Sequence, residues 1–518
     1  MEEIMPEQKL TVAYKRIKKE WKLVFATAFL SGLITYAYRF LNMLPNWDTL
    51  MDYYYPTNNM IHQGRHLQII GCMFSSFYDI PWITGLLSLL YLAVSVILVI
   101  EILQLHDKIG IVMISLLMTV FPTVISSFAF MYMADAFHSA MLFAVLAVWT
   151  SLRYRHGWIL GGMCLCMSAG IYQAYIPFAI GLIIVWLADQ LIFTKNNPIR
   201  QIGRFLLMGI WGILLYVVSL QVLVHVEGAV VGNHQGMGSM GIPDLQQIIT
   251  GVLQSYIDTL YFFTGSLRKL SLYQVGNVVL FLCAAVAAVT YIIRSRCYRQ
   301  WGRLILACLC MAALPCVAHL FYFLTGEVWY HALMQGTLWL CYVLVFLILE
   351  RTGAFQKKIS MGCIMGALLA GYACILAANT AYLKMNTSYE KTMAMLNRVV
   401  DRMEQLPEYG QASQLAVIGE VKDSHTSQLE LNPTIVGVTD GYFVTHQEHM
   451  VAALAMYYDI ELQGVEEKEL EALCEKAEIV AMPEWPAQGS VCQVGDTIVV
   501  KFSEPEADAS DRLGEEDG

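Results

Sequence analysis

Charge is the property that this 518-residue sequence has least of. Only 14% of its residues are Asp, Glu, Lys or Arg, whereas soluble domains carry about 25%. Apolar residues make up 57% of the chain. A soluble chain of this length would need far more charge to cover its surface, so a purely soluble protein is excluded. The net charge of −10 arises in the C-terminal part and is typical of a solvated domain with an acidic tail.

The sequence also lacks the motifs of several enzyme classes. Its thirteen cysteines include no CxxC pair with zinc-site spacing, and most lie in apolar runs, where cysteine behaves as a small hydrophobe. No HExxH or GxSxG motif occurs. The glycine-rich stretch 232–238 follows no predicted strand and precedes no GK[ST], so it is not a P-loop. Cytoplasmic ATP chemistry is therefore not indicated.

Long apolar runs recur from Trp21 to Leu383, and runs of about 18 residues or more are long enough to cross a bilayer. Backbone groups in hydrocarbon must be satisfied within their own segment, so we expect helices. A membrane barrel would show alternating segments of about ten residues instead. The first run is too long for a signal-peptide core, and we expect it to be retained. The sequence predicts about eleven transmembrane helices, at 20–41, 81–104, 109–130, 136–152, 157–173, 175–193, 204–226, 273–293, 303–325, 331–350 and 359–383.

Lys and Arg gather at the N-terminus and in alternate loops, which predicts a cytoplasmic N-terminus. An odd number of spans then places the C-terminal region outside. The two long loops, 42–80 and 227–272, fall on the outer side as well. The second of them contains an amphipathic stretch, 244–263, with the pattern of a helix at the membrane surface. Function is therefore expected on the outer face.

Beyond residue 384 the pattern is that of a small α/β domain. Helical periodicity covers 391–406 and 446–458, and short strands are predicted at 414–420, 435–439, 478–482 and 497–502. The expected fold is an all-α polytopic membrane bundle with a small C-terminal α/β extracytoplasmic domain. Its predicted parts are a cytoplasmic basic N-terminus at 1–19, a transmembrane domain at 20–383, the α/β domain at 384–503 and a disordered acidic tail at 504–518.

The first outer loop holds the densest group of polar residues. Asp48 and Asp52 are four residues apart, so one helical turn would place both carboxylates on the same face. A carboxylate at the outer face can act as a general base on a sugar hydroxyl or help to hold a divalent cation. Arg65 follows Gly64 and precedes His66, and its guanidinium suits a phosphate. The alternative is an ordinary hydrated loop with surface charges.

Five further residues are candidates for a substrate cavity. Asp135 and His138 lie one helical turn apart at the start of a span, where ionisable residues usually face a cavity or a partner. Tyr172 and Gln173 fall at the outer end of the fifth predicted span, and His331 falls at an outer turn. A helix N-cap, a structural histidine, an aromatic belt and a solvated turn are the respective structural alternatives.

Together these features resemble the bacterial type II glucosyltransferase family, or GtrII-like membrane proteins. The resemblance covers roughly residues 20–350. It rests on the basic N-terminus before one span and on the following segments: Asp48, Gly64-Arg65, the Pro122…Tyr132…Asp135 stretch, and Gly170-Ile171-Tyr172-Gln173-Ala174. Relatives often carry adjacent acidic residues in the first loop, whereas here Trp47 precedes Asp48 and the second acid is Asp52.

The resemblance implies a GT-C-type glycosyltransferase of the bacterial plasma membrane. Its partners would be the lipid bilayer, a polyprenyl-phosphate sugar as donor and a surface glycan as acceptor, with no nucleic acid. Asp48 would be the catalytic base, with Asp52 nearby, and Arg65 would meet the donor phosphate with His66. No nucleotide cofactor is implied, and a divalent cation stays an open alternative.

Three other functions are alternatives to sugar transfer. A transporter or flippase for a lipid-linked glycan predicts central charges and repeat symmetry between the halves, and the sequence shows few of the former and no clear repeat. A membrane anchor for a binding domain would need one or two spans. A polymerase or ligase of surface polysaccharide would share the outer loops and the lipid-linked substrates, and the sequence alone does not separate it from a transferase.

Overall fold

The computed structural model describes residues 15, 17–51, 57–75, 79–194, 196–233, 236, 240–265, 270–325, 328–354, 358–421 and 433–504. The chain forms two compact units. The first comprises Met1–Leu41, Tyr55–Asn379 and Leu431–Val436, and the second comprises Asn42–Tyr54, Thr380–Glu430 and Gly437–Gly518. The second unit therefore includes a segment of the first long loop as well as the C-terminal region.

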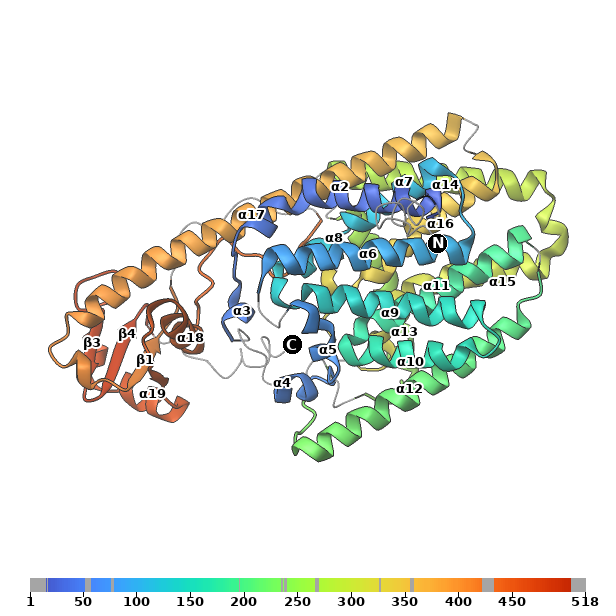
Figure 1. Cartoon of the computed structure of the whole chain (residues 1–518). Coiled ribbons are helices and arrows are strands. Elements are labelled where there is room, and N and C mark those ends of the chain that lie inside the picture. The colour runs from blue at the N-terminus through green and yellow to red at the C-terminus, as the bar shows by residue number, and fades with distance from the viewer. Residues whose placement is uncertain are drawn as a thin grey trace, which may run out of the picture. The chain divides into compact units, whose positions relative to one another are not determined.

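The first unit is a bundle of long apolar helices (Figure 1). Within the described residues, nine helical segments are long and apolar enough to cross a membrane, so this is a multi-pass membrane protein. They are built from α2 (Lys19–Leu41), α6 (Pro81–Leu103), α7 (Lys108–Thr119) with α8 (Pro122–Ala129), α9 (Ala134–Arg153), α11 (Ile176–Asp189), α12 (Ile199–Glu227), α14 (Leu272–Arg294), α15 (Trp301–Ala318) and α17 (Lys358–Glu404).

Two of the eleven predicted spans are shorter helices. The span predicted at 157–173 is α10 (Gly157–Ile171), with 15 residues. The span predicted at 331–350 begins with two short 3₁₀ turns, and only its second part forms α16 (Trp339–Arg351). In hydrocarbon such shorter helices need neighbours that satisfy the backbone beyond their ends. Both pack tightly, since α10 contacts α9 and α12 while α16 contacts α7 and α14.

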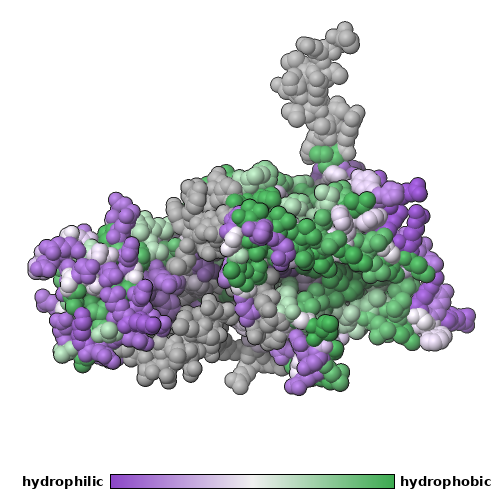
Figure 2. Space-filling model, turned by 90° about the horizontal axis from the view of Figure 1, so that it is seen from below, coloured by the Kyte–Doolittle hydropathy of each residue, from purple (hydrophilic) through white to green (hydrophobic). Residues whose placement is uncertain are grey.

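The helices of the bundle differ in burial. Helix α9 and the α7–α8 segment are largely buried among other helices, whereas α12, α14 and α15 bury only a minority of their residues. The exposed residues are mainly large and apolar, for example Leu206, Ile210 and Leu282. Figure 2 shows a mainly hydrophobic surface over the bundle and a mainly hydrophilic one over the C-terminal domain. Apolar surface of this extent fits contact with lipid rather than with water.

Helix α13 (Leu245–Thr264) differs from the surface helix expected for residues 244–263. It packs along the membrane helices α14 and α15. The Tyr256 hydroxyl donates a hydrogen bond to the Ala312 carbonyl of α15 at 2.6 Å. The ring of Phe262 lies 5.3 Å from that of Phe121 at the α7–α8 break. The small residue Gly251 allows close packing, because a Cβ atom there would lie 3.1 Å from the Phe323 ring.

The second unit contains a four-stranded sheet with the order β2-β1-β4-β3. Strand β1 (Gln414–Ile418) pairs in parallel with β2 (Gln463–Gly464) and β4 (Thr497–Lys501), and β3 (Val491–Val494) is antiparallel to β4. Helices cover both faces, which explains why the central strands are apolar on both sides. The predicted small C-terminal α/β fold is confirmed in this sheet.

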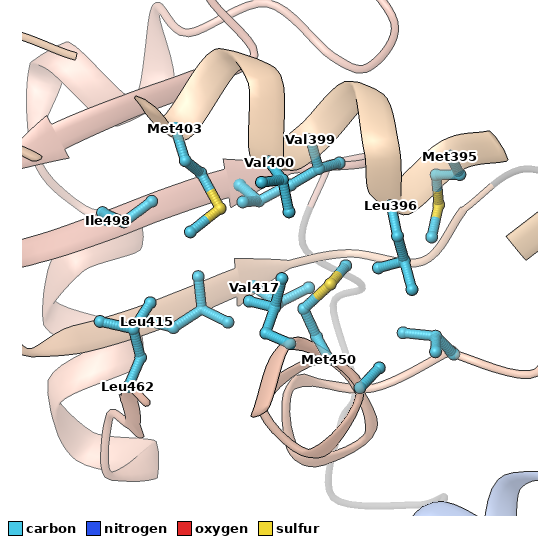
Figure 3. Packing of buried hydrophobic residues seen from close by; sticks show 14 of the residues in the cluster. Met395, Leu396, Val399, Val400, Met403, Leu415, Val417, Met450, Leu462 and Ile498 are labelled. Atoms are coloured by element: carbon cyan, nitrogen blue, oxygen red, sulfur yellow. The ribbon is translucent and has the colours of Figure 1, made fainter. Parts of the chain in front are cut away.

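The two faces of the sheet bury separate hydrophobic clusters. Leu415 and Val417 of β1 pack with the last turns of α17 and with α18 (Gln447–Tyr458), a set of side chains that Figure 3 shows in contact between helix and sheet. Ala416 and Ile418 point the other way, toward α19 (Glu467–Cys474) and α20 (Ala477–Val480). This alternation follows from the two-residue period of a strand.

Two of the four predicted strands are wrong. Residues 478–482 overlap helix α20, because Ile479 and Met482 are three residues apart and bury into one cluster, which is helical spacing. Residues 435–439 form no strand, and Gly437 there has φ of +82°, which breaks an extended backbone. The strands predicted at 414–420 and 497–502 are confirmed as β1 and β4. Short apolar runs do not by themselves distinguish strand from helix.

Helices α14 and α17 cross at two glycines, and this crossing gives a test of the packing. A Cβ atom at Gly276 would lie 2.6 Å from the Ala370 nitrogen and 2.7 Å from the Gly366 oxygen, whereas a Cβ atom at Gly209 of α12 meets nothing within 4 Å. We expect Gly276→Ala to lower the unfolding temperature of the detergent-solubilised protein, since such overpacking costs about 1–3 kcal/mol. Gly209→Ala should raise the unfolding temperature slightly, because alanine stabilises a helix interior by about 0.5–1 kcal/mol relative to glycine. Equal melting temperatures for the two variants would contradict this crossing.

Candidate active site

Arg65 is presented by a glycine turn at the end of a short helix. Helix α4 (Thr57–His62) is terminated by Gly64, which lies two residues beyond its last residue and has φ of +68°. The Gly64 amide donates to the Ile61 carbonyl at 2.9 Å, and the Arg65 amide donates to the Met60 carbonyl at 2.7 Å. This pair of bonds is the Schellman motif, in which a left-handed glycine ends a helix. The Gly64-Arg65 sequence is therefore a helix stop that orients the arginine.

The guanidinium group of Arg65 lies over the ring of Tyr172. Its central carbon is 4.8 Å from the ring centroid, a cation–π geometry. Arg65 is half-buried, and its Nε atom is buried without a hydrogen-bond partner among the described residues. Within the described residues, no carboxylate forms an ion pair with it. Arg65 is thus a held cation whose charge the neighbouring described side chains do not neutralise.

Side chains from three other segments hold the Arg65 turn. The Gln173 amide donates to the Gln63 carbonyl at 3.0 Å, and the Tyr216 hydroxyl of α12 donates to the Gly64 carbonyl, also at 3.0 Å. The backbone of Leu67 donates to the Gly170 carbonyl at the end of α10. Gly170 is required there, since a Cβ atom would lie 2.6 Å from the Leu67 side chain. Tyr172 therefore lies next to Arg65 and Gln173 next to its turn, and their place in a substrate cavity stays a prediction.

His66 is buried behind the Arg65 turn. Its Nε2 atom lies 2.8 Å from the Ser219 hydroxyl, and its ring lies 5.4 Å from the Tyr216 ring. Burial lowers the pKa of His66 below its ordinary value of 6.5, while the Gly64 carbonyl acts in the opposite direction. A histidine with a lowered pKa is neutral at physiological pH. Its described contacts stabilise the loop, and its role toward a substrate stays a prediction.

Asp135 and His138 lie at the start of α9, and both are fully buried. One oxygen of Asp135 accepts from the Ala136 amide at 3.0 Å. The Nε2 atom of His138 lies 3.2 Å from the Ser127 hydroxyl. Phe137, between them, has its ring 4.7 Å from that of Tyr172. Phe137 thus joins the start of α9 to Tyr172, whereas the hydrogen bonds of Asp135 and His138 are made with Ala136 and Ser127.

Asp48 and His331 are also among the described residues. Asp48 lies on α3 (Trp47–Met51), half-buried, and belongs to the second unit. His331 precedes a 3₁₀ turn and its ring lies 5.3 Å from that of Trp329. Asp52 is outside the described residues. In the described part of the chain, no three His, Cys, Asp or Glu side chains gather as a set of metal ligands.

A second polar network was missed by the sequence reasoning. The Tyr322 hydroxyl donates to Asp258 at 2.6 Å, and the Tyr322 ring lies 4.7 Å from that of Tyr330. Tyr330 in turn packs on His319, whose Nε2 atom lies 3.0 Å from the Gln335 amide. These residues come from α13 and from the segment after α15, and no local motif relates them. Only the packing of α13 on α15 brings them together.

A buried ion pair was also missed, although the sequence carried a signal for it. Arg39 and Asp79 are 3.7 Å apart, with side chains 0% and 1% exposed. The Arg39 Nε atom also donates to the Phe128 carbonyl at 2.9 Å. Arg39 falls inside the predicted span 20–41, where an isolated charge is costly. That cost alone predicts a buried partner, although it does not identify Asp79.

The burial of His66 predicts how stability depends on pH. Because the pKa of His66 is lowered in the folded protein, the unfolded chain binds its proton first as pH falls through 6.5, and the stability that the neutral ring contributes is lost below that value. We expect the unfolding temperature in detergent to fall by a few degrees between about pH 7.5 and about pH 5.5. His66→Gln should reduce this pH dependence, while the same change at the exposed His225 should leave it as in the wild type. Identical pH profiles for all three proteins would show that His66 is not buried as a neutral ring.

Comparison with known proteins adds one finding. The profile of the family described as Glucosyl transferase GtrII matches residues 37–350. No curated protein matches the chain, and no solved structure does. The matched stretch exceeds half of the chain, begins within α2 and ends within α16. It therefore includes the Arg65 turn, Tyr172, the Asp258–Tyr322 network and the Arg39–Asp79 ion pair. The chain therefore belongs to the Glucosyl transferase GtrII family, and this membership together with the apolar helices indicates a membrane glycosyltransferase.

Proposed function

We propose that the protein transfers a sugar, with glucose as the expected one, from a polyprenyl-phosphate donor to a cell-surface glycan. The reaction takes place on the outer face of the bacterial plasma membrane, within a GT-C-type bundle. This orientation follows from the Lys and Arg residues that alternate loops carry. Family membership supports the sugar-transfer reaction, and the lipid-linked donor is argued from the bundle and from Arg65.

The observation that carries the donor assignment is the state of Arg65. Its guanidinium is held over Tyr172, half-buried, with no carboxylate partner among the described side chains. A cation in such a place attracts an anion, and the guanidinium fork matches a phosphate. The protein also exposes apolar surfaces that suit lipid, such as the outer faces of α12 and α13, so the anion is expected to carry a lipid chain. A phosphate with a polyprenyl tail satisfies both conditions.

The proposed chemistry is a single displacement with inversion. The acceptor hydroxyl loses its proton to Asp48, and its oxygen forms a bond to the anomeric carbon of the donor sugar. The bond between that carbon and the phosphate oxygen breaks, and the polyprenyl phosphate leaves as an anion beside Arg65. A phosphate is a good leaving group, so the protein supplies mainly positioning and charge stabilisation.

The other predicted residues take supporting roles in this proposal. Gln173 and His66 hold the turn that carries Arg65, through the Gln63 carbonyl and Ser219. Asp135, His138 and His331 are proposed to line the sugar cavity, and Asp52 to assist Asp48.

The role of Asp48 can be tested in a deletion strain through the composition of its surface glycan. Complementation with the wild type should restore a sugar that the deletion strain lacks. Asp48→Asn should restore little of it, because loss of a general base costs about 10²- to 10⁴-fold in rate. Asp459→Asn is the matched control, since Asp459 is exposed on the second unit in a left-handed conformation that Asn also adopts. Full restoration by a normally expressed Asp48→Asn protein would show that Asp48 is not the base.

The role of Arg65 can be tested by Arg65→Lys, which keeps the charge but loses the planar fork and its stacking on Tyr172. We expect the KM for the lipid-linked sugar to rise by about tenfold, equivalent to roughly 1.4 kcal/mol. The exposed Arg200 at the start of α12 provides the matched Arg→Lys control and should leave the KM unchanged. An unchanged KM in Arg65→Lys would remove the phosphate contact from the mechanism.

A further inference from the structure

The segment that carries Asp48 packs with the C-terminal domain. Residues Asn42–Tyr54 form one compact unit with the α/β domain, although more than 300 residues of sequence separate them. Helix α3 contacts α18 of that domain. Leu50, two residues after Asp48, is 5% exposed and belongs to the same buried cluster as Met450 and Leu454 of α18. The core of this cluster, between α17, α18 and the sheet, is visible in Figure 3.

Helix α3 has a side-chain N-cap of its own but also depends on this packing. The Asn46 side-chain oxygen accepts from the Thr49 amide at 3.1 Å and from the Thr49 hydroxyl at 2.9 Å, and both residues are buried. This is an N-cap, which orients the first turn and Asp48 with it. A helix of five residues is too short to persist in water by itself. Its conformation must therefore come from the tertiary contacts of Leu50.

The C-terminal domain lies outside the part of the chain that the family profile matches. The match ends at residue 350, before α17 and before the whole sheet. A catalytic carboxylate must be held to within a fraction of an ångström of its working position, and loops rarely achieve this without a rigid support. Here the rigid support that α3 contacts is the α/β domain.

We propose that the C-terminal α/β domain is a positioning element of the transferase, which holds Asp48 in place through Leu50 and α18. This inference rests on the proposed function, since it assigns the domain a role in the same reaction. Leu50 and Leu454 are positioning residues in this scheme. They touch no substrate, and they act through the orientation of α3.

The test compares leucine truncations on the two faces of the sheet in the full-length protein. Leu50→Ala and Leu454→Ala loosen the cluster that holds α3. Leu473→Ala removes an equally buried leucine from the cluster on the opposite face, against α19. Each variant is assayed in membrane vesicles with undecaprenyl-phosphate glucose and surface glycan from the deletion strain. Hydrogen exchange of the α3 amides is measured on the same preparations.

We expect Leu50→Ala and Leu454→Ala to lower kcat by about tenfold or more, with the donor KM unchanged, because misplacement of a catalytic group affects the chemical step. Exchange of the α3 amides should become faster in both. Leu473→Ala should keep kcat within about twofold of the wild type, and Leu50→Met should recover most of the lost activity, because it restores the buried volume.

Wild-type kcat in Leu50→Ala and Leu454→Ala would overturn the inference, and so would an equal loss in Leu473→Ala. These outcomes leave the proposed function standing as long as the wild type transfers sugar. A wild type that transfers no sugar, in vesicles or in the complemented strain, overturns the proposed function and the inference with it.

Discussion

Water is absent from the hydrocarbon core of a bilayer, and each backbone N–H and C=O there must find its partner within its own helix or a neighbour. This constraint explains the length and apolar composition of the nine candidate spans among the described residues, and the exposed apolar surfaces of α12, α14 and α15. It also explains why the shorter helices α10 and α16 are packed among other helices. Where the chain departs from long regular helices, at the α7–α8 break and at Tyr172, the backbone is enclosed by protein.

The same low dielectric makes every charge in the bundle expensive, and the charges that do occur are paired or placed for use. Arg39 is neutralised by Asp79, and Arg351 by Asp189 at 2.8 Å. Arg65 differs, because its charge meets only the face of an aromatic ring among the described residues. An uncompensated cation costs stability that a structural role would not justify. The most economical explanation is an anionic ligand, which is why the proposed donor carries a phosphate.

The C-terminal domain is built differently from the helical bundle, around a small sheet. Its sheet buries one cluster on each face, and one of these clusters accepts a leucine from the first loop. The helical membrane domain is thus not the only scaffold on which predicted site residues lie. Arg65, Tyr172 and Gln173 belong to the first unit, and Asp48 belongs to the second.

The sequence by itself determined the class of protein, the position of most spans, the C-terminal sheet and the family, because these depend on hydrophobic run length, two-residue alternation and short local motifs. It also singled out Gly64-Arg65 and Tyr172-Gln173 as candidates; the helix stop at Gly64 is local, whereas the contact of Arg65 with Tyr172 is not. Tertiary structure alone decided that α13 packs along α15, that Arg39 pairs with Asp79, that Asp258 joins Tyr322, and that Asp48 belongs with the α/β domain. Residues 478–482 show the same limit on a small scale, since their apolar spacing fits strand or helix until a partner surface is present. The α13–α15 packing, the two polar pairs and the place of Asp48 all depend on contacts between segments far apart in the chain. The free energy of such contacts has no signature in local periodicity.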